Sequence, residues 1–308
     1  MRLLKCVMTA VAATMLATSA SAETTIKIGY TALGDNMIDF VAIDKGFFKK
    51  HGIDASAVML RNASVIVPGI ISGDIQMGTV TSPSFVQALD SGLTLKAVNN
   101  LSLTSKGDKT AGLVVPVDSK ITKPSDLSGK VLGVGAIGSF ITVGTREWLR
   151  QVGVDTSKTK TIETPMPQLG DTVRNGNVDY TVLPEPLLAK ALANGGLRQI
   201  VNPFAELPEG KAIMINVVSS DWAKANPDAI VAVRKATEEA KAWALDNKKE
   251  AMDIVAKYLD IPPAVVAQSS FPNIEVKITP ESLDWWVDVM KAQNMLRGNP
   301  KPSEAVLK

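Results

Sequence analysis

Short apolar runs alternate with stretches of helical periodicity along most of this chain. Such alternation is typical of an α/β fold with a mainly parallel sheet. The runs predict strands at about residues 26–30, 55–60, 75–80, 131–135, 160–164, 178–183 and 212–219. Helical stretches separate the first three strands, and the next three repeat that design. The pattern therefore predicts two α/β units.

The two units also share an internal repeat. Ile28–Asp35 and Leu132–Ser139 each contain an apolar run, a glycine, an alanine, an aliphatic residue, a second glycine and a small polar residue. Gly73–Met77 corresponds to Gly176–Tyr180 in the same chain order. Because several matches occur in order at nearly constant spacing, we predict that the two units have the same fold.

Helix starts are marked by capping residues. Ser82-Pro83 predicts a serine N-cap followed by proline at the first helical position, and Glu185-Pro186 predicts the same arrangement in the second unit. Ser139 is expected to cap a helix that runs towards residue 150.

The last hundred residues predict two long helices. Asn226-Pro227 opens one that extends to about residue 259, and Thr279-Pro280 opens another. In the second, apolar residues recur at helical spacing and predict a buried stripe of Leu283, Trp286, Val287 and Met290. We expect this part of the chain to return to the first unit.

A ligand site is expected where the two units face each other. In parallel α/β sheets, ligands bind beyond the carboxyl ends of the strands, beside helix N-termini that suit an oxyanion. The candidate ligand-binding residues at these turns are Thr31, Leu33, Gly34, Asp35, Asn62, Thr81, Ser82, Gly138, Ser139, Phe140 and Glu185.

Several of these residues have two interpretations. Gly138-Ser139 is either an anion-binding turn or an ordinary helix cap. Glu185 is either a helix cap or an acceptor for a ligand N–H group. Arg61 either pairs with a ligand carboxylate or sulfonate or is a solvated surface residue. Phe140 either stacks on a ligand ring or packs in the core.

Composition narrows the chemistry. The 308 residues include 33 Lys plus Arg, 31 Asp plus Glu, one His and one Cys. A formal net charge of +2 gives no reason to expect a nucleic-acid partner. One cysteine and one histidine cannot form an internal disulfide or fill a Cys/His zinc site, and His51 is expected to be structural. We therefore expect no metal, no cofactor and no catalytic residue.

The first 22 residues have the features of a secretory signal. Arg2 and Lys5 precede an apolar run, and Ala20-Ser21-Ala22 is a small-residue cleavage site. Cleavage after Ala22 would remove both charges and the cysteine at position 6, leaving 31 basic and 31 acidic residues. We expect export to the periplasm.

An ordered series of motifs carries a family resemblance. The motifs are Ala42–Phe48, His51–Asp54, Ser72–Gly78, Pro124–Val134, Gly176–Tyr180, Glu185-Pro186 and Asn226-Pro227. Through them the chain resembles the substrate-binding proteins of ABC importers, specifically the nitrate/sulfonate/taurine group, which includes the binders of thiamine-pyrimidine precursors.

This resemblance implies a two-lobed type II periplasmic binding fold. Two mixed, mainly parallel sheets with helices on both faces would enclose a ligand cleft, with the chain divided into 23–104, 105–208 and 209–308. The ligand would be held near Thr31 to Asp35, Ser82, Gly138-Ser139 and Glu185. Lobe closure on the ligand would precede delivery to a membrane permease and its ATPase by a monomer.

The ligand class and two other functions remain open. A sulfonate, a carboxylate or a nitrogen heterocycle fits the candidate turns. An exported enzyme of the pyrimidine-synthase type is an alternative, although the mature chain lacks that group's cysteine-rich motif. A periplasmic sensory protein is another alternative.

Overall fold

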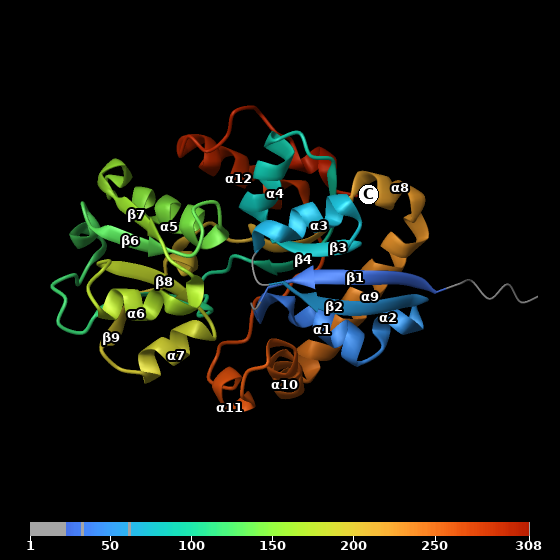
Figure 1. The fold of residues 1–308 in the computed structure, drawn as a ribbon, viewed down its shortest axis with the longest axis horizontal. Coiled ribbons are helices and arrows are strands. Elements are labelled where there is room, and N and C mark those ends of the chain that lie inside the picture. Colours follow the sequence, from blue (N-terminus) through green and yellow to red (C-terminus); the bar gives the residue numbers. More distant parts are fainter. Residues whose placement is uncertain (1–22, 32–33, 61–62, 308) are drawn as a thin grey trace, which may run out of the picture.

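The structure, a computed structural model, describes residues 23–31, 34–60 and 63–307. It forms two lobes, each built on one five-stranded sheet (Figure 1). The lobe 1 sheet has the order β2-β1-β3-β10-β4, with strands β1 (Thr24–Tyr30), β2 (Ile53–Met59), β3 (Met77–Thr81), β4 (Leu95–Leu103) and β10 (Ala212–Ser219). The lobe 2 sheet has the order β7-β6-β8-β5-β9, with strands β5 (Ala111–Pro116), β6 (Val131–Val134), β7 (Lys160–Glu163), β8 (Tyr180–Pro184) and β9 (Leu197–Val201). Both sheets mix parallel and antiparallel pairs, so the predicted fold class is confirmed.

The sequence repeat corresponds to equal positions in the two sheets. In lobe 1, Ile28 of β1 pairs with Met77 of β3. In lobe 2, Leu132 of β6 pairs with Tyr180 of β8, which is the same register at the repeat offset. The two lobes therefore share strand order, strand direction and register.

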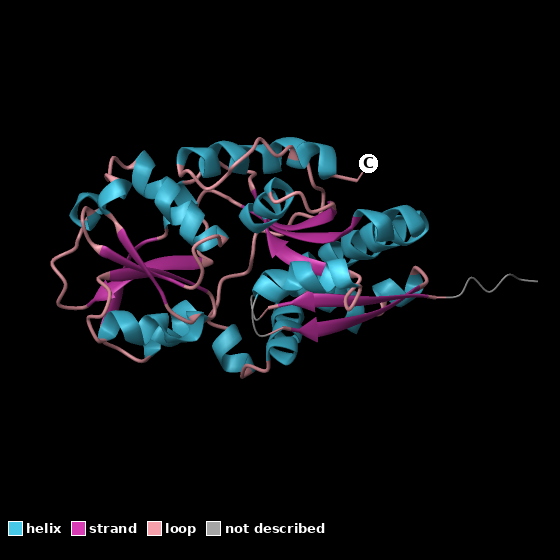
Figure 2. Ribbon diagram, turned by 45° about the horizontal axis from the view of Figure 1, so that its top comes forward, coloured by secondary structure: helices cyan, strands magenta, loops and turns pink. Residues whose placement is uncertain are grey.

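Helices cover both faces of each sheet (Figure 2). Those of lobe 1 are α1 (Met37–Asp44), α2 (Phe47–Lys50), α3 (Ile66–Ser72), α4 (Ser82–Asp90), α8 (Ser220–Ala225), α9 (Pro227–Asp246), α10 (Lys248–Leu259), α11 (Pro263–Val266) and α12 (Pro280–Ala292). Those of lobe 2 are α5 (Phe140–Gln151), α6 (Leu169–Arg174) and α7 (Leu187–Ala193). The C-terminal helices thus pack on the first lobe, while the middle of the chain forms the second.

Two sequence predictions about elements were wrong. The predicted helix from 226 to about 259 is two helices, because Asn247 leaves the helical region (φ −124°, ψ 45°) between α9 and α10. Strands β4, β5 and β9 were not predicted. In β4, Asn99, Asn100 and Ser102 interrupt the apolar run, yet all three are buried because residues 273–276 cover that edge.

The C-terminal stripe was predicted correctly. Leu283, Trp286 and Met290 of α12 are fully buried, and the Trp286 indole Nε1 donates to the Ala212 carbonyl at 2.7 Å. Trp285 is only partly buried and meets Trp286 edge-on. Helix α12 is therefore anchored to the first residue of β10.

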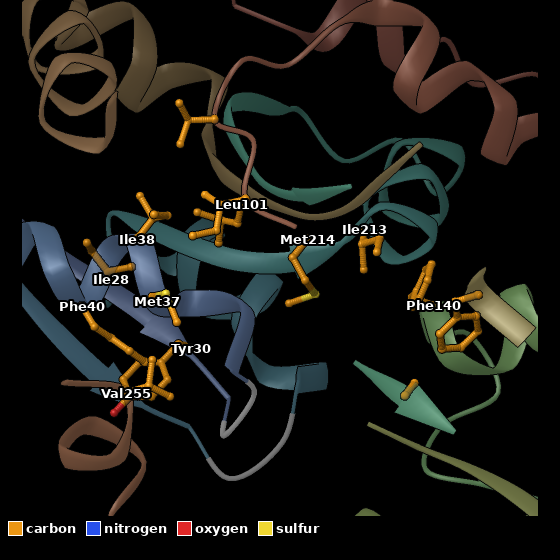
Figure 3. Packing of buried hydrophobic residues seen from close by; sticks show 14 of the residues in the cluster. Ile28, Tyr30, Met37, Ile38, Phe40, Leu101, Phe140, Ile213, Met214 and Val255 are labelled. Atoms are coloured by element: carbon orange, nitrogen blue, oxygen red, sulfur yellow. The ribbon is translucent and has the colours of Figure 1, made fainter. Parts of the chain in front are cut away.

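Aromatic packing fixes the end of β1 in the core of lobe 1. The Tyr30 ring meets Phe40 at 4.8 Å between centroids, and Phe40 stacks on Tyr258 at 4.5 Å. The Tyr30 hydroxyl donates to the Tyr258 carbonyl at 2.8 Å. Tyr30, Phe40 and Val255 gather on one side of the core (Figure 3). Tyr30 is thus a packing residue that ties β1 to α10.

A buried carboxyl lies inside lobe 1. The two carboxyl oxygens of Asp39, on α1, accept hydrogen bonds from Asn216 Nδ2 at 2.9 and 3.0 Å. The Thr79 hydroxyl donates to Asn216 Oδ1 at 2.9 Å. Among the described residues, no lysine, arginine or histidine forms an ion pair with Asp39. Burial raises the pKa of Asp39 to about 7, while the Asn216 and Thr79 side chains offset part of this effect.

This carboxyl predicts a pH dependence of stability. The folded-state pKa of Asp39 is about 7, whereas its ordinary value is 3.8. Between these two pH values the folded protein keeps a proton on Asp39 that the unfolded chain has lost. Asp39 should therefore lower the free energy of unfolding as pH rises from about 4 to 7, by up to ~1.4 kcal/mol per pH unit. Asp39→Asn should remove this contribution, measured by urea unfolding at pH 5 and pH 7.

Asp54→Asn is the matched control, because Asp54 is exposed on β2. It should keep the wild-type difference between the two pH values. Equal differences in Asp39→Asn and wild type would contradict the prediction.

Candidate ligand-binding site

The carboxyl ends of the parallel strands lie where the two lobes meet. Thr81, the last residue of β3, pairs with Met214 near the start of β10, and Pro184, the last of β8, pairs with Ala111 at the start of β5. Strands β10 and β5 each begin directly after the chain has crossed between lobes (Figure 1). The strand ends therefore lie beside the crossings, in both lobes.

The two crossings, residues 104–110 and 202–211, are tied together at Thr104. Its backbone N–H donates to the Lys211 carbonyl at 2.8 Å, and its carbonyl accepts from Gly210 at 2.9 Å. Its buried hydroxyl donates to the Pro208 carbonyl at 2.7 Å and accepts from the Lys211 N–H at 2.8 Å. Thr104 therefore joins the two crossings into one hydrogen-bonded connection between the lobes.

Helix α4 begins one residue earlier than its sequence suggested. Thr81, rather than Ser82, is the N-cap: its backbone is extended and its Oγ1 accepts from the Ser84 N–H at 3.3 Å. Ser82 is then the first helical residue and Pro83 the second. The Ser82 hydroxyl is fully buried and has no hydrogen-bond partner among the described residues. The start of α4 thus places the Ser82 hydroxyl, which has no described partner, beside the end of β3.

Helix α5 begins as predicted, with Ser139 as its N-cap. The Ser139 Oγ accepts from the Thr142 N–H at 3.3 Å, and the Thr142 hydroxyl donates to the Ala136 carbonyl at 2.6 Å. A Cβ added to Gly138 would lie 2.9 Å from Oε1 of Gln87 on α4. Glycine at this position therefore lets the turn of lobe 2 approach helix α4 of lobe 1.

Phe140 is committed to packing rather than free for a ligand ring. Its ring lies 4.6 Å from Phe204 and 5.4 Å from Trp286, between centroids, and only 5% of the residue is exposed. Gln293, after α12, adds a polar contact by donating to the Val143 carbonyl at 3.0 Å. Helices α5 and α12 thus join the lobes on this side.

Glu185 contacts both its own helix and the other lobe. Its Oε2 accepts from the Ala189 N–H at 3.2 Å and from the Ser269 hydroxyl at 3.5 Å. Pro186, which follows a cis peptide bond, occupies the N-cap position of α7. The arrangement predicted from Glu185-Pro186, with Glu185 as the N-cap and Pro186 as the first helical residue, was therefore wrong. Burial raises the pKa of Glu185, and both hydrogen bonds lower it. This carboxyl serves the helix start and also faces lobe 1.

On the lobe 1 side, Asp35 lies near the first crossing. It belongs to a 3₁₀ turn that includes Gly34, and Asn36 Nδ2 from the same turn donates to the Thr31 carbonyl at 3.2 Å. Burial raises the pKa of Asp35, Ser102 lowers it, and the charge of Asp108 raises it further. Asp35 and Glu185 therefore place two carboxyl groups on opposite sides of the lobe junction.

Some predicted residues lie outside the described part of the chain. They are Leu33, Asn62, Arg61 and the signal segment 1–22 with its cleavage site. Conversely, Gln87, Ser102, Asp108 and Ser269 lie at the junction and were not predicted. Gln87 lies on the predicted helix α4, whereas Ser102 lies on the unpredicted strand β4, Asp108 in the first crossing and Ser269 after α11. No local motif marks any of these four residues as a site residue.

Two negative findings apply to the described residues. None of the helices there is long and apolar enough to cross a membrane. No group of three or more His, Cys, Asp or Glu side chains there is placed to hold a metal ion.

Solved structures with this fold include periplasmic binding proteins. The periplasmic aliphatic sulphonate binding protein SsuA from Escherichia coli superposes with a TM-score of 0.77 at 19% identity, covering 92% of this chain and 97% of that one. The periplasmic nitrate-binding protein NrtA from Synechocystis PCC 6803 superposes with a TM-score of 0.76 at 18% identity, covering 91% and 84%. At these identities the likeness establishes the fold.

Sequence comparison adds family membership. The nitrate/nitrite binding protein NrtA of Nostoc sp. strain PCC 7120 is 25% identical over 275 residues, covering 82% of this chain and 62% of that protein. The chain thus spans about three-fifths of the length of the curated nitrate/nitrite binding proteins that it matches first. The model of the NMT1-like family matches residues 19–260. Because this match covers most of the chain, the protein belongs to the NMT1-like family.

Proposed function

We propose that this protein is the substrate-binding component of an ABC import system. It captures a small organic solute between its lobes and delivers it to a membrane permease. The observation that carries the proposal is the pairing of two sheets with equal order and register, whose strand ends and helix starts lie at one junction. A ligand that contacts both lobes favours their closed arrangement because it binds that arrangement more tightly.

The ligand class follows from the groups at the junction. The starts of α4 and α5 offer backbone N–H groups and the Ser82 hydroxyl, which suit a carboxylate or sulfonate oxygen. Glu185 and Asp35 are acceptors for ligand N–H groups. The site therefore suits an organic solute with an anionic end, an N–H donor or both: a sulfonate, a carboxylate or a nitrogen heterocycle.

The relatives support a transport role. Those quoted above are named for binding nitrate, nitrite or aliphatic sulphonate. A bicarbonate transport ATP-binding protein from Synechocystis matches 73% of this chain over 36% of its own length. By analogy we infer a permease and an ATPase as partners, a monomeric capture protein without catalytic activity, and a periplasmic location after cleavage following Ala22.

A ligand screen tests the proposal. Aliphatic sulfonates, carboxylates, aminopyrimidines and nitrate would be tested by thermal shift, and each compound that raises the melting temperature would be titrated by calorimetry. We expect at least one class to bind and to be recovered unchanged after long incubation. Turnover of the bound compound would instead favour the pyrimidine-synthase alternative, and a complete absence of binding would remove the basis for a capture role.

Ser139→Ala separates capping from binding. Loss of the N-cap acceptor should lower the free energy of unfolding by about 1 kcal/mol, measured by urea unfolding. Ser139→Asp should recover this stability because the carboxylate accepts the same N–H bond, but it has no hydroxyl donor. If Ser139 donates to the ligand, the calorimetric affinity should fall in both variants. Unchanged affinity in both would limit Ser139 to capping.

Glu185→Gln tests the acceptor role. A hydrogen bond from ligand N–H to a charged carboxylate contributes about 1.5–3 kcal/mol, so affinity for an N–H-bearing ligand from the screen should fall by roughly 10- to 100-fold. Glu209→Gln is the matched control, because Glu209 is exposed in the second crossing. The same affinity in Glu185→Gln, Glu209→Gln and wild type would assign Glu185 to capping α7.

A further inference from the structure

Arg146 of α5 is a partly buried arginine that forms no ion pair with an acid in the described part of the chain. Its Nη2 donates to the Thr161 hydroxyl of β7 at 2.7 Å. Within the described residues, no carboxylate lies within ion-pair distance of its guanidinium, whereas Arg150 and Arg174 each pair with an acid three residues away. The partial burial of Arg146 removes part of the hydration of its charge and so lowers its pKa.

Two unused hydroxyl groups lie in the same part of lobe 2. The hydroxyls of Tyr180 and Thr159 are buried and have no hydrogen-bond partner among the described residues. The two hydroxyls are neighbours, and burial raises the pKa of Tyr180 while the contact with Thr159 lowers it, but their geometry is too poor for a well-formed hydrogen bond. Residues 161 and 180 flank Leu132 in adjacent strands, so both side chains lie on the same face of the sheet.

These four residues, Arg146, Thr159, Thr161 and Tyr180, form a cluster with a surplus of donors. The Thr161 oxygen already accepts from Arg146, so its proton is free for another partner. Burial raises the pKa of Tyr180, so its hydroxyl keeps its proton at neutral pH. Asp179 is the nearby acid, but its Oδ2 accepts from the Val131 N–H at 2.7 Å.

We propose that this cluster binds a small inorganic oxyanion, such as phosphate or sulfate. Its oxygens would accept from the guanidinium and from the Tyr180, Thr159 and Thr161 hydroxyls. A water molecule could satisfy two or three of these donors, but it would leave the desolvated guanidinium without a counter-charge, which is costly.

The cluster is separate from the ligand site at the lobe junction. Lys160 and Tyr180 are the first residues of β7 and β8, so the cluster lies at the amino ends of these strands. The proposed ligand site lies beyond their carboxyl ends. Helix α5 and β7 lie together in lobe 2, and α5 reaches from this cluster to the junction (Figure 1). This inference does not depend on the proposed transport function.

A phosphate titration tests the site. The full chain would be titrated with sodium phosphate at constant ionic strength, balanced with sodium chloride, and followed by thermal shift and calorimetry. Wild type should show saturable binding with one site. Arg146→Gln and Tyr180→Phe should each weaken phosphate binding at least tenfold. Lys160→Gln is the control: it removes an exposed charge from β7, the strand of Thr161, and should bind phosphate like wild type.

Tyr180→Phe and Arg146→Gln differ in their expected effect on folding stability. Tyr180→Phe removes a buried hydroxyl without a partner, so in chloride alone it should be at least as stable as wild type. A phosphate response that does not saturate, or one that is equal in wild type and Tyr180→Phe, would overturn the proposal. If Arg146→Gln fails to fold, Tyr180→Phe and Thr159→Val carry the comparison.

Discussion

The arrangement of the two lobes depends on the contact between the two crossings at Thr104. Four hydrogen bonds join this residue to 208–211, so the crossings cannot shift past one another. On the lobe 2 side of this contact Asn202 Nδ2 donates to the Asp108 carbonyl at 2.7 Å, so a closing motion would bend the two segments together. The lobes would then move as rigid bodies about a fixed point, the hinge mechanism of ligand-clasping proteins.

A second contact limits the direction of this motion. Phe140 packs on Trp286 across the lobes, and Gln293 donates to the carbonyl of Val143. Separating these groups would expose aromatic surface and leave the Gln293 amide N–H without its acceptor, and both changes oppose opening. By contrast, the contact between Ser269 and Glu185 is a single long hydrogen bond. We therefore infer that the junction opens more easily at Glu185 than at α5.

Charge is distributed unevenly within lobe 2. The carboxyl ends of its strands lead to Glu185, whereas their amino ends lie beside the uncompensated guanidinium of Arg146. One set of strands therefore supports Glu185 at the junction and, at the far end, the donor cluster with Asp179 beside it. An anion held at the far end would stabilise the strands that position Glu185, without itself contacting the ligand.

The candidate site shows where local signals are insufficient. Ser139 was predicted as a cap because N-capping depends on one side chain and the next three residues. Whether Phe140 would be core or ligand contact could not be decided, since its partners Phe204 and Trp286 are 64 and 146 residues away in the chain. Ser102 and Ser269 had no local mark at all.

The sequence by itself determined the α/β class, the repeat and the helix starts at Ser139, Asn226 and Thr279, because hydrophobic periodicity and capping are properties of short segments. It also indicated the turns around which a ligand site would form. Only the tertiary structure decided that β4, β5 and β9 exist, that the helix after residue 226 breaks at Asn247, and which polar groups meet at the junction. These features depend on contacts between distant segments: a strand with buried asparagines is stable only when another segment covers its edge.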